Sequence, residues 1–395
     1  MLSFGVLVGE LSPVTSPRRK NIWGCHDGYK ADVPWSQWAD GLASASLLCY
    51  RKPVIQGAGQ VVTDRPIVVA GAGAIGCFVG GQLAAAGRRV ALLVRPRVKT
   101  EIERFGLRLT DFDGSEKKLE AGRLALSEEP AIFHSAGIVL VTVKSADTAD
   151  VADQIARHAP EDAVIVSLQN GVDNVAVLNE RLGGRRVLAG MVPFNVVAMG
   201  EGRFHRSSSG DIHVGEDASN TAAALSVPGL TMRADSDITG VQWGKLIINL
   251  NNALSALSDL PLVAQLADRD WRRLFADQMA EGLAALKAAG ITPVSATPIP
   301  MSWTPTLLRL PDVIFNAILG RTMKIDPEAR SSMWQDLKQG RTTEIDYLQG
   351  AVIALAEQNR VAVPLMRRIV ALVKEAETSG KGPPGLSPQQ IRGMA

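Results

Sequence analysis

Residues 66–76 read PIVVAGAGAIG, and this stretch decides the expected fold of the chain. The segment 67–70 is apolar and mostly β-branched, which is typical of a buried parallel strand. The six residues that follow match the pattern G-x-G-x-x-G: Gly71, Ala72, Gly73, Ala74, Ile75 and Gly76. A helix is expected next, from Cys77 to Ala86, and Gly87 is a natural helix stop. A strand, a glycine turn and a helix in this order predict a site for the pyrophosphate of a dinucleotide.

Each glycine of the turn has an expected role in that site. Gly71 permits the tight turn, Gly73 lets the backbone approach the phosphates, and Gly76 lets the helix pack against the strand. The N-terminus of the helix adds free N–H groups and the positive end of its dipole. The motif therefore predicts a nicotinamide- or flavin-dependent enzyme. The plain alternative is the glycine turn of an ordinary strand–helix unit.

Hydropathy offers a second interpretation of the same region, because no charged residue occurs between Pro66 and Gly87. A stretch of that length could span a membrane. It is, however, crowded with glycine, and its second half has a low density of aromatic and long aliphatic residues. We therefore expect it to begin a folded domain, and we expect no membrane association.

Length and composition narrow the class of protein. A chain of 395 residues with a net charge of +2 suggests two domains and gives no electrostatic case for nucleic acid. The three cysteines make no disulfide framework, and neither cysteines nor histidines have the spacing of a metal site. We expect a small-molecule substrate, no metal and a reducing cytoplasmic compartment, and a homodimer stays open.

The chain divides into four expected segments. Residues 1–60 hold three of the seven tryptophans and no sustained helical or strand period, which indicates a poorly specified N-terminal extension. Residues 61–234 are expected to form a Rossmann-like α/β domain that binds a dinucleotide, and residues 235–378 an all-helical substrate and catalytic domain. Residues 379–395 are rich in glycine and proline, which predicts a loose C-terminal tail.

The end of the second expected strand, Arg89 to Val94, selects between the two nicotinamide cofactors. NAD-binding units carry an acidic residue near this point, where it accepts hydrogen bonds from the ribose hydroxyls. Here the strand is followed by Arg95, Pro96 and Arg97, without a carboxylate. Guanidinium groups pair well with a 2′-phosphate, so the sequence favours NADPH over NADH. Two solvated arginines in a surface turn are the alternative.

Two further strand ends are expected to face the cofactor crevice, because open parallel sheets bind ligands beyond the carboxyl ends of their strands. Strand 138–143 is followed by Lys144, and strand 163–167 runs into Gln169, Asn170 and Gly171. Their shared position makes Lys144 and Asn170 candidate ligand contacts. The other elements expected in this half are strands at 107–111 and 118–126 and a helix at 148–158.

From about residue 236 the apolar spacing becomes helical. A long helix is expected from Ser236 to about Leu257, capped by Asp235 or Ser236. Lys245 and Asn249 share one face of it, and burying such groups without partners is costly. They are either site residues or part of a wet face. Further helices are expected at residues 269–289, 305–319, 351–356 and 365–373, with another helix start at Pro327.

A last polar cluster combines Ser331–Asp336 with Gly340–Asp346, which reads GRTTEID. Serines, an arginine and carboxylates gathered this closely favour recognition of a small, polar, anionic molecule. Each of these residues taken singly has a surface explanation.

These residues, in this order, resemble the 2-dehydropantoate 2-reductases, also called ketopantoate reductases. The resemblance covers about residues 66–363. It rests on an ordered set of motifs: Gly71 to Gly76, Arg95, Lys144, Gln169-Asn170-Gly171, Lys245 with Asn249, Ser332, and Gly340 to Asp346. It implies NADPH-dependent reduction of the 2-keto acid 2-dehydropantoate to pantoate, in pantothenate biosynthesis. It also implies a Rossmann-like domain followed by a helical domain, with the active site between them.

The resemblance implies a role for each matched residue. Lys245 is the general acid that protonates the ketone oxygen, and its charge stabilises the developing alkoxide. Asn249 hydrogen-bonds the substrate, Ser332 holds its carboxylate, and Asn170 touches substrate and cofactor. Glu344 binds the substrate hydroxyl or the cofactor ribose and helps to position Lys245. The residues implied to hold NADPH are Gly71 to Gly76, Arg95, Lys144, Asn170 and Glu344.

One departure from the family pattern concerns the substrate. Many relatives carry a second asparagine one turn after Asn249, where this chain has Ala253, so a reductase of the same fold acting on another 2-keto acid is an alternative. An opine- or 3-hydroxyacyl-type dehydrogenase would rely on a histidine, and no histidine follows His213. A non-catalytic NADPH-binding regulator would need neither Lys245 nor Glu344.

Overall fold

The computed structural model of the 395-residue chain describes residues 65–295, 299–318 and 329–393. The expectations for residues 1–60 and for Pro327 lie outside the described residues. The described residues belong to one compact unit of the chain. A domain boundary at about residue 234 stays a prediction. The described elements before that point include strands, and those after β12, which ends at Asp235, are helical.

The described strands form two sheets. They are Ile67–Ala70 (β1), Val90–Leu93 (β2), Leu107–Asp111 (β3), Glu116–Leu119 (β4), Ala125–Ser127 (β5), Ile138–Val141 (β6), Val164–Ser167 (β7), Val187–Met191 (β8), Val196–Gly200 (β9), Arg203–Arg206 (β10), Ile212–Gly215 (β11) and Met232–Asp235 (β12). Eight of them form one sheet in the order β12-β11-β8-β7-β6-β1-β2-β5. From β5 to β8 the neighbours are parallel, in the order 3-2-1-4-5-6 of a doubly wound dinucleotide-binding sheet.

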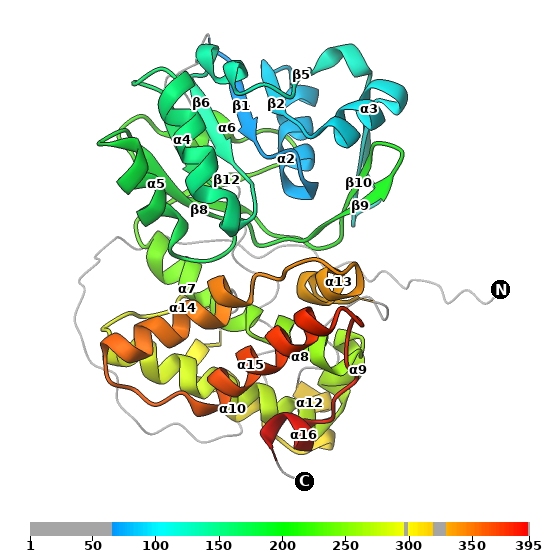
Figure 1. Cartoon of the computed structure of the whole chain (residues 1–395), viewed down its shortest axis with the longest axis vertical. Coiled ribbons are helices and arrows are strands. Elements are labelled where there is room, and N and C mark those ends of the chain that lie inside the picture. The colour runs from blue at the N-terminus through cyan, green and yellow to red at the C-terminus, as the bar shows by residue number, and fades with distance from the viewer. Residues whose placement is uncertain (1–64, 296–298, 319–328, 394–395) are drawn as a thin grey trace, which may run out of the picture. The chain divides into compact units, whose positions relative to one another are not determined.

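Helices flank the large sheet, and the described elements that follow the sheet are helical (Figure 1). Those before residue 236 are Ala74–Ala85 (α2), Pro96–Phe105 (α3), Thr148–His158 (α4), Asn174–Leu182 (α5) and Thr221–Leu225 (α6). Those after it are Ile238–Asn249 (α7), Asn251–Ser258 (α8), Leu262–Ala267 (α9), Arg269–Ala288 (α10), Thr304–Leu308 (α11), Asp312–Ile318 (α12), Ser332–Lys338 (α13), Ile345–Gln358 (α14), Pro364–Ser379 (α15) and Pro388–Arg392 (α16). Short 3₁₀ turns lie at Ala121–Arg123 (η1), Pro130–Ser135 (η2), Ser145–Asp147 (η3) and Met301–Trp303 (η4).

Strand β1 lies at the centre of the large sheet, and its burial follows from its sequence. All four residues are buried, and Ile67 pairs with Val90 of β2 on one side and with Ile138 of β6 on the other. Alternate side chains of a strand point to opposite faces. Val69 therefore packs in the cluster that includes α2, whereas Val68 packs in the cluster that includes α4 and α5. The expected α/β fold is confirmed.

The smaller sheet has the order β4-β3-β10-β9. The strand expected at residues 118–126 is wrong, because η1 turns the chain between Leu119 and Ala125. The two halves of that segment consequently join different sheets, β4 the small one and β5 the large one. Residues 171–235 carry no element predicted from the sequence, whereas the structure has α5, α6 and strands β8 to β12 there.

The single helix expected from Ser236 to Leu257 is also wrong in two details. Its N-cap is Asp237, whose carboxylate accepts a hydrogen bond from the N–H of Gly240. It is interrupted at Leu250, between α7 and α8, where the buried Gln349 donates a 2.9 Å hydrogen bond to the Leu250 carbonyl. The helix expected at 305–319 is divided into α11 and α12 by Pro311, which has no N–H to continue a helix.

The C-terminal residues are not a loose tail up to Gly393, contrary to the expectation for residues 379–395. Ser387 caps α16 through a reciprocal bond pair with Gln390, and the side chain of Ile391 is fully buried. The N–H of Leu386 donates to the carbonyl of Leu257, and Arg392 forms an ion pair with Asp277 of α10. Burial of one apolar side chain together with these polar contacts holds the segment against the helical core.

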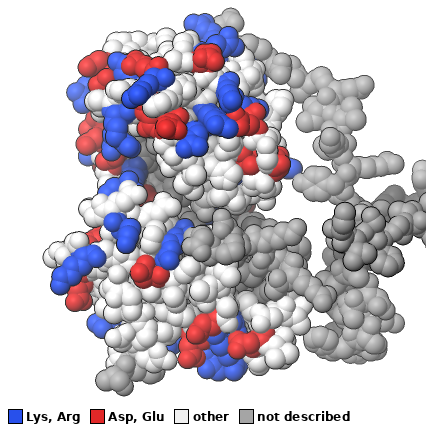
Figure 2. Space-filling view, turned by 90° about the vertical axis from the view of Figure 1, so that its right-hand side faces the viewer, with Lys and Arg blue, Asp and Glu red and all other residues white. Residues whose placement is uncertain are grey.

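Among the described residues, no helix combines the length and the apolar character that a membrane span requires. Figure 2 shows one face of the molecule, on which basic and acidic side chains are intermingled rather than separated by sign. This arrangement agrees with the small net charge of +2.

Candidate active site

The glycine turn joins the carboxyl end of β1 to α2. Gly71 has a φ of +102°, and a Cβ built on it would lie 2.6 Å from Cγ1 of Val143, so the turn requires glycine here. A Cβ on Gly76 would lie 2.6 Å from Oγ1 of Thr142. Gly73 is different, because it is exposed and an added Cβ would meet no atom within 4 Å. The protein's own packing does not require glycine at 73, and this open backbone fits the close approach of a dinucleotide phosphate.

Helix α2 begins directly after this turn. Ala74, Ile75 and Gly76 form its first turn, where N–H groups have no acceptor within the helix, and Ala72 is buried beneath it. Free N–H groups and the helix dipole favour an anion at this point. The residues present therefore fit the pyrophosphate of a dinucleotide.

Arg95 lies where the sequence analysis places it, at the carboxyl end of β2. It is the N-cap residue of α3, its side chain is 85% exposed, and it makes a long ion pair of 3.4 Å with Asp147. Such an exposed pair contributes little to stability, so the guanidinium can exchange this carboxylate for another anion. Arg97 is also exposed, in the first turn of α3.

Lys144 follows β6 as expected, but it has a protein partner that the sequence analysis did not anticipate. Its Nζ lies 2.8 Å from Oδ1 of Asp336 in α13 and also donates to the carbonyl of Thr342. Asp336 is nearly fully buried and makes a second ion pair, of 3.0 Å, with Arg341. Lys144 therefore connects the end of a sheet strand to the helical segment that carries the GRTTEID motif.

Three predicted site residues from three distant segments meet in one hydrogen-bonded group. Nζ of Lys245, on α7, donates to Oδ1 of Asn170 at 2.8 Å and to the carbonyl of Val192 at 2.5 Å. The Nδ2 group of the same asparagine donates to Oε2 of Glu344, the N-cap residue of α14, at 3.4 Å. The amide of Asn170 thus lies between an ammonium group and a carboxylate. Its oxygen faces the ammonium group of Lys245, and its N–H faces the carboxylate of Glu344.

The environment of Lys245 lowers the pKa of its ammonium group to about 8, from the usual 10.5. The main cause is burial, which penalises the charged form, and the negative charge of Glu344 partly opposes this effect. A lysine with this pKa remains mostly protonated near neutral pH and releases its proton far more readily than an exposed lysine. Lys245 can therefore serve as a proton donor to a bound ligand.

A chain of buried polar side chains supports Asn170 from behind. The backbone carbonyl of Asn170 accepts a 2.6 Å hydrogen bond from Nδ2 of Asn174 and a 3.0 Å bond from the hydroxyl of Ser145. Thr148 donates to Oδ1 of Asn174, and Gln169 donates to Thr148. Asn174 and Thr148 are not among the site residues predicted from the sequence, although Asn174 follows the Gln169-Asn170-Gly171 motif and Thr148 begins the helix expected at 148–158.

Two predicted substrate contacts lie outside this hydrogen-bonded group. Asn249 ends α7 one turn after Lys245 and is partly buried, and Ser332 is the exposed first residue of α13. Ser331, beside it, is the N-cap of that helix and donates to the carbonyl of Asn252. Ala253, at the position of the departure from the family pattern, is fully buried in the helical core.

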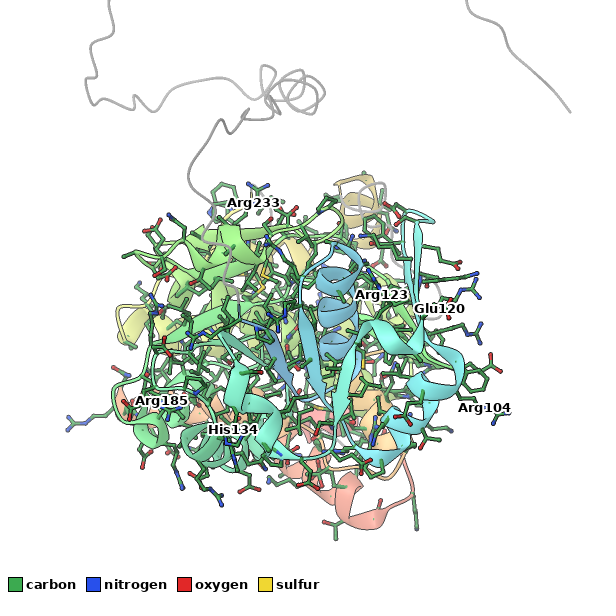
Figure 3. The ribbon with its side chains drawn as sticks, turned by 90° about the horizontal axis from the view of Figure 1, so that it is seen from above. Arg104, Glu120, Arg123, His134, Arg185 and Arg233 are labelled. Carbon is green, nitrogen blue, oxygen red and sulfur yellow. The ribbon has the colours of Figure 1, made fainter. Side chains whose placement is uncertain are left out.

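The amino-terminal ends of the parallel strands, opposite to the strand ends described above, carry a different set of residues. Figure 3 views the sheet from the end where its parallel strands begin and labels Arg123, His134 and Arg185, which precede β5, β6 and β8. A hollow of about 540 Å³ at this edge is lined by Arg88, Arg123 and His134 among others. It contains none of the three residues Asn170, Lys245 and Glu344, so it is not the site described above.

The family models for "Ketopantoate reductase PanE/ApbA" and for its C-terminal part match residues 67–219 and 237–377. The chain belongs to the ketopantoate reductase family. It is therefore an oxidoreductase of the 2-dehydropantoate 2-reductase type, which acts on a CH–OH group. The expected family and enzyme class are confirmed.

The relatives of this ketopantoate reductase family member match nearly their whole length. The chain is 29% identical over 323 residues to the 2-dehydropantoate 2-reductase of Halobacterium salinarum, which covers 80% of this chain and 99% of the relative. It is 26% identical over 328 residues to the enzyme of the same name from Archaeoglobus fulgidus, with 79% and 98% covered.

Solved structures agree with this assignment. A ketopantoate reductase from Ralstonia eutropha superposes with a TM-score of 0.69 at 29% identity and covers 80% of this chain and 99% of its own. A D-mandelate dehydrogenase, solved with NADH and anilino(oxo)acetate, superposes with a TM-score of 0.67 at 20% identity, with 80% and 99% covered. At that identity the second likeness shows the fold alone.

Proposed function

We propose that this chain reduces 2-dehydropantoate to pantoate with NADPH, a step of pantothenate biosynthesis, and that Lys245 is the general acid. The observation that carries the proposal is the hydrogen bond from Lys245 to Asn170, whose amide in turn donates to Glu344, in surroundings that lower the pKa of the lysine to about 8. The relatives named 2-dehydropantoate 2-reductase support the substrate.

The proposed chemistry separates hydride transfer from proton transfer. NADPH, when bound, supplies a hydride to the carbonyl carbon of the keto acid. Lys245 donates one proton from Nζ to the carbonyl oxygen as negative charge develops there, and it regains a proton from solvent. Asn170 orients Nζ, and the negative charge of Glu344 favours the protonated form of Lys245.

The choice of NADPH rests on the carboxyl end of β2. Arg95 and the exposed Arg97 lie there, and residues 94–97 include no acidic residue at the position where NAD-binding units carry one. Gly71 to Gly76 would hold the pyrophosphate, and Lys144 would exchange Asp336 for a cofactor group. Asn170 and Glu344 would contact the nicotinamide end.

The substrate would be held by the helical part of the site. We assign Asn249 to a substrate hydrogen bond because it lies one turn after Lys245 on α7. We assign Ser332 to the substrate carboxylate because it begins α13, the helix whose Asp336 pairs with Lys144. The alternative is another 2-keto acid, which the buried Ala253 favours because an alanine cannot supply the amide that relatives place there.

The test is an NADPH-oxidation assay with a panel of branched 2-keto acids that includes 2-dehydropantoate. The proposal predicts the highest kcat/KM for 2-dehydropantoate and a clear preference for NADPH over NADH. Activity on a different acid, with none on 2-dehydropantoate, would replace the substrate but retain the reductase. Absence of turnover with every acid, in a folded protein that binds NADPH, would favour a non-catalytic regulator.

We also propose a cytoplasmic location and a homodimer. The free, buried thiol of Cys77 fits a reducing compartment, and a ketopantoate reductase from Staphylococcus aureus with the same fold is described as dimeric. Cell fractionation and light scattering of the purified chain test the two statements separately.

A further inference from the structure

The strongest unassigned feature is the buried polar chain behind Asn170. Its members come from β7, the turn after it, η3, α4 and α5, and they are Ser145, Ser167, Gln169, Thr148 and Asn174. Each is at most 7% exposed. A group of five buried polar side chains is costly unless every donor and acceptor is paired, so it needs a physical reason.

The hydrogen bonds of this chain run in one direction toward the active site. Ser167 donates to Gln169 at 3.0 Å, and Gln169 donates to Thr148 at 2.7 Å. Thr148 donates to Oδ1 of Asn174 at 2.8 Å. The Nδ2 group of Asn174 then donates two hydrogen bonds, one to the carbonyl of Asn170 at 2.6 Å and one to Oγ of Ser145 at 3.2 Å. The side chain of Asn174 is therefore fully satisfied in one orientation only.

Within the described part of the chain, the backbone of Asn170 makes no hydrogen bond to another backbone group. It follows the end of β7, and the next residue, Gly171, has a φ of +87°, so no strand ladder continues there. Its carbonyl is held by the side chains of Asn174 and Ser145. The direction of the Asn170 side chain, which contacts Lys245 and Glu344, consequently depends on those two bonds.

We propose that Asn174 is a positioning residue of the reductase, which fixes Asn170 so that its amide bridges Lys245 and Glu344. This inference rests on the proposed function, because it assumes that Lys245 performs the proton transfer. Among the described residues, Asn174 makes no hydrogen bond to Lys245 or to Glu344. It acts through the carbonyl of Asn170, which it holds directly, and through Ser145, whose hydroxyl donates to the same carbonyl and, at 3.4 Å, to Oε1 of Glu344. Its competing explanation is purely structural: it would only anchor the first turn of α5, with no effect on the site.

A double-mutant cycle separates the two explanations. The variants are Asn174→Ala, Asn170→Ala and the double variant, with Asn179→Ala as the matched control, because Asn179 is an exposed asparagine of the same helix. A positioning role predicts that Asn174→Ala lowers kcat about tenfold, and that the double variant is within about twofold of Asn170→Ala alone. The Kd for NADPH of Asn174→Ala should stay within about threefold of wild type. Losses in kcat that multiply would overturn the proposal.

A second readout needs no substrate. Limited acetylation of Lys245 across a pH series, followed by peptide mass spectrometry, reports the pH at which its amine becomes reactive. Loss of a hydrogen bond to the ammonium form favours the neutral amine, so Asn174→Ala and Asn170→Ala should both move this midpoint to lower pH than in wild type. The other charged group that acts on this lysine, Glu344, is unchanged in both variants. A midpoint for Asn174→Ala that is unshifted or raised would overturn the proposal.

Thr148→Val protects the test against a folding failure of Asn174→Ala. Valine has nearly the volume of threonine, and the hydroxyl of Thr148 donates to Oδ1 of Asn174 and accepts from Gln169; none of its hydrogen bonds among the described residues is to Asn170 or Lys245. We expect Thr148→Val to change kcat and the acetylation midpoint of Lys245 in the same direction as Asn174→Ala, but by a smaller amount. If wild type turns over no 2-keto acid, the proposed function fails, and the acetylation series alone still decides whether Asn174 positions Asn170.

Discussion

The pH dependence of the reaction provides the most quantitative prediction of this structure. Burial lowers the pKa of Lys245 to about 8, and the neutral amine cannot donate the required proton. Between about pH 7 and pH 9 the protonated fraction of such a group falls from about 90% to about 10%, so kcat/KM should fall about tenfold. The sign follows from the group: a lysine acts as an acid below its pKa and loses this ability above it.

The assay is NADPH oxidation with 2-dehydropantoate. The quantity to follow is kcat/KM, because its pH dependence reports the pKa values of the enzyme before the substrate binds. Glu344→Gln supplies a second arm, since loss of the carboxylate removes the charge that opposes the effect of burial. The midpoint of this variant should lie below that of wild type. A profile that stays flat to about pH 10, or a midpoint that rises in Glu344→Gln, would refute the assignment of Lys245 as the acid.

Three further predictions concern the cofactor and the fold. Arg95→Ala should weaken NADPH binding about tenfold, which corresponds to the loss of one charge-assisted hydrogen bond of about 1.5 kcal/mol, and leave NADH binding nearly unchanged. Titrations with both cofactors check this, and equal losses of affinity would contradict it. Gly71→Ala should lower the free energy of unfolding by about 1–3 kcal/mol or more because of its positive φ, whereas Gly73→Ala should keep the Tm and weaken NADPH binding. Ile391→Ala should cost about 2–4 kcal/mol in denaturant unfolding, and a loss below about 0.5 kcal/mol would show that the C-terminal segment is loose after all.

The first strand, the glycine turn and the start of α2 could be predicted because local sequence determines them. Apolar β-branched residues form the buried strand, and the positive φ of Gly71 is a property of a single position. The same holds for Lys245, which reaches one face of α7 by helical spacing. The meeting of Lys245 with Asn170 and Glu344 was accessible only through the family resemblance, since it depends on packing between segments far apart in the chain.

Other features depend on contacts that no local pattern reveals. The partner of Lys144, Asp336, lies 192 residues further along the chain, so its ion pair could not be inferred from spacing. Asn174 looks like an ordinary polar residue at a helix start until Asn170 is placed beside it. The C-terminal segment is a different case, because Ser387 and Gln390 form a capping box that the glycine- and proline-rich composition obscured.

The most direct test of the central claim is the turnover of Lys245→Met, which keeps much of the side-chain volume but has no proton to donate. If Lys245 is the acid, kcat with 2-dehydropantoate should fall about 100-fold to 10,000-fold in this variant, with NADPH affinity and Tm close to wild type. Lys287→Met, at an exposed lysine of α10, should retain full activity. If purified Lys245→Met turns over at the wild-type rate, Lys245 is not the acid and the proposed mechanism is wrong.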